Sequence, residues 1–124
     1  MPHDLFILTP RHEAAFALAG LNRFKIKAAK LLRKQFLSCE AKSDEALQTD
    51  IQRWMIAIRQ KDILTETDMY RYFEAAVTLQ EMGQDILRNG RIGSLLDSAA
   101  DAESRSARIL EEAKSQSKSR RSGK

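Results

Sequence analysis

Apolar residues recur every three or four positions through most of the chain, which is the spacing of an amphipathic helix. This pattern predicts four helices, over residues about 10–39, 44–61, 66–89 and 95–113. Their ends carry matching signals. Pro10 suits the first turn of the first helix, Ser43, Thr65 and Ser94 suit the N-cap positions of the next three, and Gly90 suits the cap that ends the third.

The predicted helices are joined by short connections, so helices adjacent in sequence are expected to pack antiparallel. We therefore predict an all-α fold, either a four-helix bundle or two packed helical hairpins, with a long first helix. Composition agrees, because the chain has 16 Ala and 14 Leu but one Val, and β-branched residues are the poorer helix formers. Residues 1–113 would form a single helical domain.

The last eleven residues, 114–124, contain only Ser, Gln, Gly, Lys and Arg. A segment without large apolar residues cannot help to build a core. We therefore expect residues 114–124 to be a disordered basic tail.

Charge is distributed unevenly along the chain, although its net formal charge is only +4. Residues 1–39 carry +5, residues 40–112 carry −6 and residues 113–124 carry +5. Such sorting by position is typical of proteins whose charged segments bind a partner of opposite sign. The acidic middle is an equally suitable partner for both basic ends.

The predicted first helix carries a row of cations with no acid between residues 13 and 40. Arg23, Lys27, Lys30 and Lys34 are four, three and four positions apart and so share one side of the helix, with Arg33 beside them. This row is a candidate binding face for phosphates or for an acidic protein surface. The alternative is a solvated face whose side chains pair with acidic helices of the same molecule.

The basic tail is a second candidate contact. Its cations are Lys114, Lys118, Arg120, Arg121 and Lys124. Cations spaced by serines suit loose contact with nucleic acid, an acidic protein groove or an anionic membrane surface. The alternative is a solubilising end without a dedicated partner.

Four further residues are candidate interface anchors, because Trp, Tyr and Arg dominate the energetics of many protein interfaces. They are Trp54, Tyr70, Arg71 and Tyr72. The alternative is that the tyrosines lie at the edge of the core and that Trp54 lies within it.

Signals of catalysis are nearly absent. His3 and His12 lie near the N-terminus, Cys39 has no second cysteine to pair with, and no zinc-binding or glycine-rich phosphate motif occurs. We predict no catalytic, metal-binding or cofactor-binding residues. The longest apolar run is far shorter than the roughly 20 residues of a membrane span. We expect a cytoplasmic location.

We therefore predict a non-enzymatic protein that acts by binding. It would be an adaptor, chaperone-like or accessory subunit that presents its basic helix and tail to an acidic protein partner. The alternative is a nucleic-acid-associated accessory or regulatory protein that contacts the phosphate backbone. A third interpretation is a homodimer in which basic residues of one subunit meet acidic helices of the other.

Overall fold

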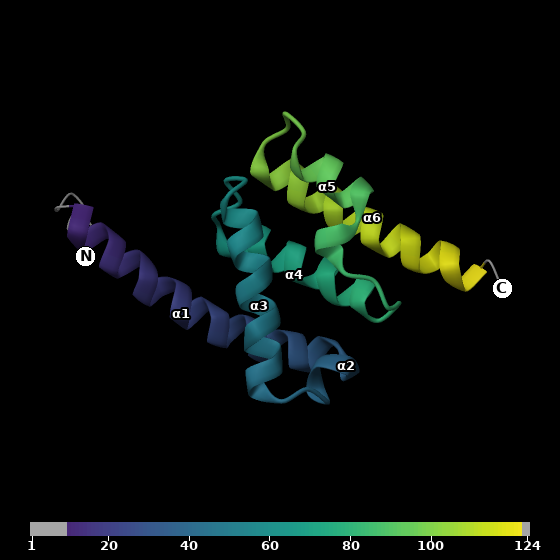
Figure 1. Cartoon of the computed structure of the whole chain (residues 1–124), viewed down its shortest axis with the longest axis horizontal. Helices are drawn as coiled ribbons and strands as arrows, with labels where there is room; N and C mark the ends of the chain where they lie inside the picture. The colour runs from purple at the N-terminus through teal and green to yellow at the C-terminus, as the bar shows by residue number, and fades with distance from the viewer. Residues whose placement is uncertain (1–9, 123–124) are drawn as a thin grey trace.

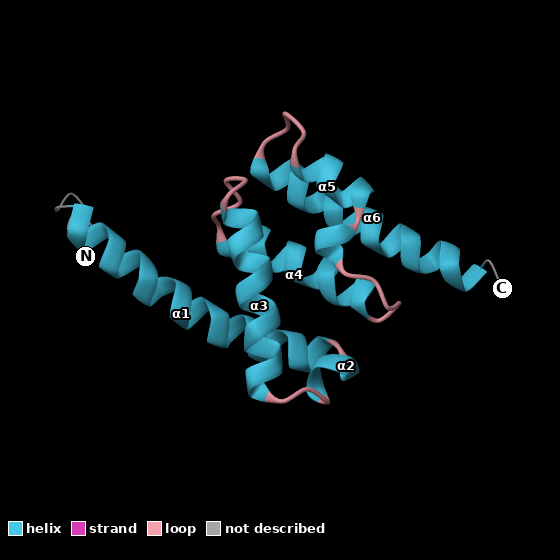
Figure 2. Ribbon diagram, in the orientation of Figure 1, coloured by secondary structure: helices cyan, strands magenta, loops and turns pink. Residues whose placement is uncertain are grey.

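The computed structural model describes the backbone of residues 10–122 and the side chains of residues 20–119 (Figure 1). These residues form helices joined by loops and contain no strand, which confirms the all-α prediction (Figure 2). The elements are α1 Pro10–Gln35, α2 Leu37–Glu40, α3 Asp44–Arg59, α4 Glu66–Gln80, the 3-10 helix η2 Ile86–Arg88, α5 Gly90–Leu96 and α6 Ala102–Ser122. Six α-helices and one 3-10 helix thus stand where the sequence predicted four helices.

The predicted starts of the first three long helices are confirmed. Pro10 is the first residue of α1. The Ser43 hydroxyl accepts a hydrogen bond from the Ala46 N–H at 3.1 Å at the start of α3. The Thr65 hydroxyl accepts one from the Asp68 N–H at 3.2 Å at the start of α4. In each cap a side-chain oxygen satisfies a backbone donor that has no partner within the helix.

The first predicted helix is interrupted at Phe36, whose backbone is extended with φ −126° and ψ 124°. Residues 10–39 therefore form α1 and the one-turn α2 instead of one helix. No proline or glycine causes this break. Contacts made by the turn account for it: Cys39 becomes fully buried and the Ser38 hydroxyl donates to Glu81 at 2.8 Å. Tertiary contacts outweigh local helix propensity at this point.

The third predicted helix ends nine residues early, at Gln80 rather than 89. Gly83 has φ +80°, and the N–H groups of Gly83 and Gln84 donate to the carbonyls of Gln80 and Leu79, both at 2.9 Å. This is the glycine-terminated cap predicted for Gly90, placed seven residues earlier. Gly90 instead opens α5.

Asn89 and Asp101 are the N-caps that the sequence analysis missed. The Asn89 side chain accepts from the Ile92 N–H at 3.1 Å and starts α5. The Asp101 carboxylate accepts from the Ser104 N–H at 2.8 Å, and α6 begins one residue after it. Ser94 lies inside α5 and caps nothing, so the helix predicted over 95–113 is corrected to α5 and α6.

The backbone of α6 continues as a helix to Ser122, whereas the sequence analysis expected residues 114–124 to be disordered. Lys, Arg and Gln are good helix formers, and residues 102–122 contain no proline or glycine. Tertiary contacts reach this far along the helix, because Gln116 accepts a hydrogen bond from the Asn89 side chain at 3.0 Å. Gly123 and Lys124 lie outside the described residues.

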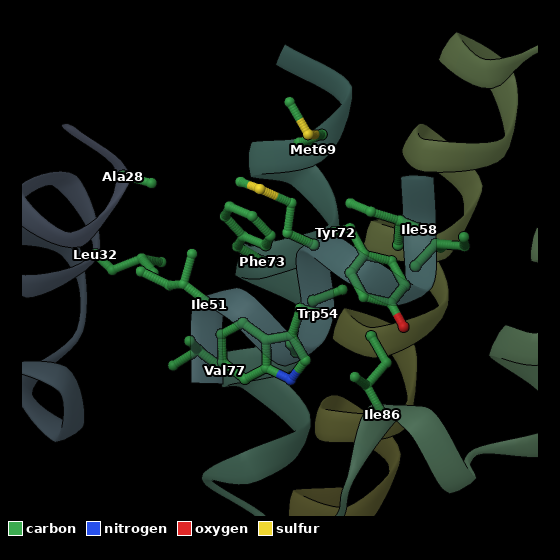
Figure 3. Packing of buried hydrophobic residues seen from close by; sticks show 14 of the residues in the cluster. Ala28, Leu32, Ile51, Trp54, Ile58, Met69, Tyr72, Phe73, Val77 and Ile86 are labelled. Atoms are coloured by element: carbon green, nitrogen blue, oxygen red, sulfur yellow. The ribbon is translucent and has the colours of Figure 1, made fainter. Parts of the chain in front are cut away.

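The core is built around α4, which contributes more buried residues than any other helix among the described side chains (Figure 3). Phe73 of α4 stands between Phe24 of α1 and Trp54 of α3, with ring centroids 5.9 and 6.0 Å apart. Such aromatic pairs add about 0.5–1.5 kcal/mol each beyond the area they bury. α4 also makes its most extensive contacts with α6, so helices distant in sequence form the main pairing.

The two ends of the chain extend away from this core in opposite directions (Figure 1). α1 buries only Phe24, Ala28 and Leu32 among its described side chains, and its N-terminal part projects beyond the other helices. The C-terminal part of α6 projects at the far end of the molecule. Both α1 and α6 therefore pack against the core over part of their length and project beyond it at one end.

Candidate functional site

Contacts on its two sides hold α1 in a fixed rotation against the body. On the α3 side, the Lys25 ammonium donates to the Gln52 side chain at 2.6 Å. On the α4 side, the Gln35 amide donates to Glu74 at 2.6 Å. With Phe24 packed inward between these contacts, the opposite face of α1 points to solvent.

This outward face carries the predicted row of cations, and all four of its members are exposed. Lys27 reaches Glu66 at 3.1 Å, but both side chains are more than half exposed, so this pair is weak. Arg23, Lys30 and Lys34 make no hydrogen bond or ion pair with any side chain that the structure describes. Most of the positive charge on this face is therefore free.

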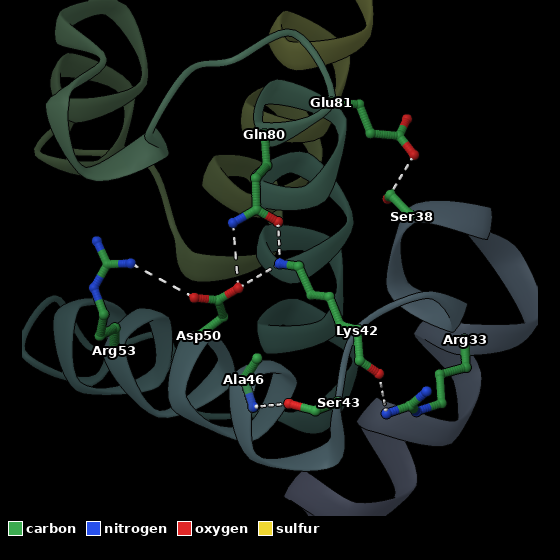
Figure 4. A network of polar contacts seen from close by, with 9 residues as sticks. All are labelled: Arg33, Ser38, Lys42, Ser43, Ala46, Asp50, Arg53, Gln80 and Glu81. Carbon is green, nitrogen blue, oxygen red and sulfur yellow. Dashed lines mark hydrogen bonds and ion pairs between the residues drawn. The ribbon is translucent and has the colours of Figure 1, made fainter.

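Arg33, the fifth predicted member of the face, has a structural role instead (Figure 4). Its guanidinium donates to the carbonyls of Glu40 at 3.3 Å and Lys42 at 3.0 Å, and it pairs with Asp44 at 2.7 Å. These bonds close the connection between α2 and α3. Arg33 is half-buried and is not part of the free row.

Two apolar side chains lie among the free cations, which the sequence analysis did not foresee. Ile26 is 56% exposed and Leu31 is 41% exposed. A shallow depression of about 400 Å³ on this face is lined by Arg23, Ile26, Lys27, Lys30, Leu31 and Lys34. A second depression of similar size, between α1 and α3, shares Ile26 and Lys30 with the first and has a mainly apolar lining that includes Leu47.

The structure describes the side chains of two of the five cations predicted to make contacts in the C-terminal region. Lys114 and Lys118 are exposed and lie one turn apart on α6. The side chains of Arg120 and Arg121, and the whole of Lys124, lie outside the described residues. Lys114 and Lys118 lie on α6 and the row lies on α1, two helices that project at opposite ends of the molecule (Figure 1).

The predicted interface anchors are corrected, because α1 and α6 cover α4 from different sides. Trp54 and Tyr72 are each only 2% exposed and belong to the core. Burial and the nearby Asp85 raise the pKa of Tyr72, so its hydroxyl stays protonated. Neither side chain can serve as an exposed anchor.

Tyr70 and Arg71 are half-buried and bonded within the molecule. The Tyr70 hydroxyl donates to the Gln35 side chain at 2.9 Å, and burial followed by the nearby Glu74 carboxylate raises its pKa to about 12. Arg71 donates to the Ser106 hydroxyl at 3.3 Å and the Glu103 carbonyl at 3.4 Å. These two residues therefore attach α1 and α6 to α4.

Five of the fifteen acids in residues 40–112 pair with cations of the same segment. Of the eight ion pairs between described side chains, two reach α1 and six lie within residues 42–112. The Lys42 ammonium donates at 2.6 Å both to Asp50 and to Gln80 (Figure 4). Arg53 pairs with Asp85 at 3.0 Å. Acids that are already paired are poor partners for the row on α1.

Arg105 is a buried cation that no pattern in the sequence singled out. Its Nη1 donates to the carbonyls of Lys61 at 2.9 Å and Leu96 at 2.8 Å, and its Nε is buried without a partner. Lys61 follows the end of α3, and Leu96 ends α5. The guanidinium thus joins two helix C-termini, where a positive charge is stabilised by both helix dipoles.

The rest of the described structure offers few other starting points for function. Cys39 is fully buried, and burial is the main cause that raises its pKa, so its thiol has little thiolate character. No group of His, Cys, Asp or Glu residues within residues 20–119 is placed to hold a metal ion. None of the helices described here is both long and apolar enough to cross a membrane.

Comparisons with protein-family models, with curated proteins and with solved structures find no match for this chain. An inference about function therefore rests on the geometry of the outward face of α1.

Proposed function

We propose that this protein is a non-enzymatic accessory or adaptor subunit that binds an acidic protein partner through the outward face of α1. The observation that carries the proposal is the state of Arg23, Lys30 and Lys34, which are exposed and make no ion pair with any acid among the described side chains. From Arg23 to Lys34 the face extends about 16 Å along the helix axis. This length suits a segment of a protein partner.

The cations of this face repel one another and so lower the stability of α1, which supports a binding role. Cations three or four positions apart on a helix repel one another by about 0.2–0.5 kcal/mol per pair. The row contains successive pairs of this kind, and among the described side chains only Lys27 of the row has an acidic partner. A face that lowers the stability of its own helix is explained by an anionic partner that removes the repulsion.

The exposed apolar residues favour a protein over nucleic acid. Ile26 and Leu31 gain nothing beside phosphates, which stay hydrated and bind through charge. Against protein side chains, each square ångström of apolar surface removed from water contributes about 25 cal/mol. A mixture of apolar and cationic residues is therefore more useful for contact with an acidic protein.

The basic C-terminal part of α6 is proposed as a second, weaker contact. Lys114 and Lys118 are exposed there, but no exposed large apolar residue accompanies them on α6. Contacts made by charge alone at a fully exposed position contribute little and are screened by salt. The tail would assist association more than it would determine the choice of partner.

The test is a comparison of variants in a pull-down at about 50 mM salt, where exposed charges are poorly screened. The triple variant Arg23→Glu, Lys30→Glu, Lys34→Glu should lose a protein partner that the wild type retains after nuclease treatment. Arg88→Glu is the matched control, because Arg88 is exposed and lies in η2, which packs against α4 and α5. Capture that disappears with nuclease would support the nucleic-acid alternative, and capture unchanged by the triple variant would exclude the α1 face.

A further inference from the structure

We infer that the outward face of α1 is a seat for one α-helix of the partner, an amphipathic helix with an acidic stripe beside an apolar stripe. This inference rests on the proposed function and specifies the partner. Three features of the face carry it: the spacing of its residues, the two depressions along it, and the sign of its charge.

The spacing is that of a helix-packing surface. The six residues that line the depression on α1 fall at positions i, i+3, i+4, i+7, i+8 and i+11, starting from Arg23. Residues spaced in this way form the ridges and grooves through which one helix packs against another. α1 already packs its opposite face against the body, so the outward face offers a second packing surface over about three turns.

The two depressions indicate how a helix would lie. They share Ile26 and Lys30, and the second continues from α1 onto α3, where its floor includes the fully buried Leu47. An apolar stripe seated over Ile26 and this hollow would leave the neighbouring stripe facing Arg23, Lys30 and Lys34. Carboxylates on that second stripe would meet the three free cations.

The positive charge of the outward face of α1 excludes binding of the basic surfaces of a second copy of this chain. The depression on α1 is lined by four cations and no acid, and the acid that lines the second depression, Asp44, is paired with Arg33. Two copies of α1 placed face to face would therefore repel each other. The exposed cations of α6 at Lys114 and Lys118 repel this face for the same reason. A nucleic acid would satisfy the cations but would leave the apolar residues unused. An anionic membrane could use both kinds of residue, and vesicles in the experiment below separate it from a helix.

The experiment measures binding of two labelled synthetic peptides to the full chain by fluorescence anisotropy. Each peptide contains about 18 residues, Leu and Glu in equal numbers with the same uncharged end groups, which is long enough to form a helix over the face. In the first, Leu recurs every three or four positions and Glu fills the neighbouring stripe. In the second, the same residues alternate, so a helix would have no continuous apolar side.

We expect the first peptide to bind at least about tenfold more tightly than the second, because only the first presents both stripes at once. The triple variant Arg23→Glu, Lys30→Glu, Lys34→Glu should weaken it by about tenfold or more at about 50 mM salt. Ile26→Ser should weaken it several-fold. Ile56→Ser is the matched control, since Ile56 is 51% exposed on α3 and lies in neither depression, and it should change nothing.

Each alternative result overturns a different statement. Equal binding of the two peptides, with no effect of Ile26→Ser, would overturn the helix seat and leave an acidic protein partner in place. Binding of duplex DNA or of vesicles rich in anionic lipid, with no binding of either peptide, would overturn both the seat and the proposed function. Circular dichroism checks that each variant is folded, and the neutral variant Lys30→Gln, which should weaken the first peptide measurably, replaces the triple variant if it is not.

Discussion

Replacing Lys30 by glutamate should stabilise the protein while it weakens partner binding. Lys30 is exposed near the middle of the outward face of α1 and makes no described ion pair. Its neighbours at three and four positions are Lys27, Arg33 and Lys34, all cations. Changes of opposite sign in stability and in binding would show that the side chain serves a partner and not the fold.

The magnitude follows from the helix geometry. Each neighbour at i±3 or i±4 contributes about 0.2–0.5 kcal/mol of repulsion, and reversing one charge converts it to a similar attraction. Three neighbours would give a gain of about 1–3 kcal/mol, which exposure to solvent reduces to about 1 kcal/mol. Lys30 lies before the last turn of α1, so the helix dipole opposes the new carboxylate only slightly.

The assay is urea unfolding followed by circular dichroism, at about 50 mM and about 1 M NaCl. The gain should be present at low salt and nearly absent at high salt, with an unchanged denaturant slope. Lys27→Glu is the contrasting variant, because Lys27 has a partner to lose in Glu66 at 3.1 Å, and its gain should be smaller. A loss of stability in Lys30→Glu at low salt would refute the reasoning that this cation is unpaired.

Three further predictions concern the fold that positions the face. Arg105→Met should lower the free energy of unfolding by about 2 kcal/mol in a urea titration. Two charge-assisted hydrogen bonds to carbonyls are lost, while one unpaired buried Nε is removed. The control Arg108→Met, at an exposed site on the same helix, should lower it by less than about 0.5 kcal/mol. Gly83→Ala should cost about 1 kcal/mol through its φ of +80° alone, because a Cβ there meets no atom within 4 Å, and thermal unfolding that matches the wild type would contradict this. The pKa of Asp101 is lowered from 3.8, chiefly by the backbone hydrogen bond it accepts in the first turn of α6, so its stabilisation is present above that value and is lost as the pH falls through the lower folded pKa. Asp101→Asn keeps a cap acceptor and should have a melting temperature that depends less on pH in this acid range.

Helices and their starts could be predicted from the sequence because their causes are local. Ser43 and Thr65 cap their helices through bonds to residues three positions on, and the apolar period is set by the helix itself. The end of α4 also had a local signal in Gly83. The apolar period continues past this glycine to Ile86, so periodicity alone predicts a longer helix than the one that forms.

The break at Phe36 and the role of Arg33 could not be predicted in the same way. Both depend on bonds to residues whose positions are set only after the helices pack. Arg33 closes the connection that brings α3 back beside α1, and Ser38 reaches Glu81 more than forty positions away. Side-chain partners at such separations leave no periodic trace in the sequence. Only the structure therefore shows that Arg33 does not belong to the row of exposed cations on α1.

The fate of the acidic middle decides how the row on α1 is interpreted. The sequence offered these acids as internal partners for the cations, and this would have made the row a structural feature. For two of these acids the geometry argues otherwise, because Lys42 holds Asp50 beside Gln80 of α4, and Arg53 holds Asp85 at the start of η2. Charge neutralised within the body cannot offset the repulsion along α1. An acidic partner from outside the chain can offset it, and covering Ile26 at the same time would add a term that salt does not screen.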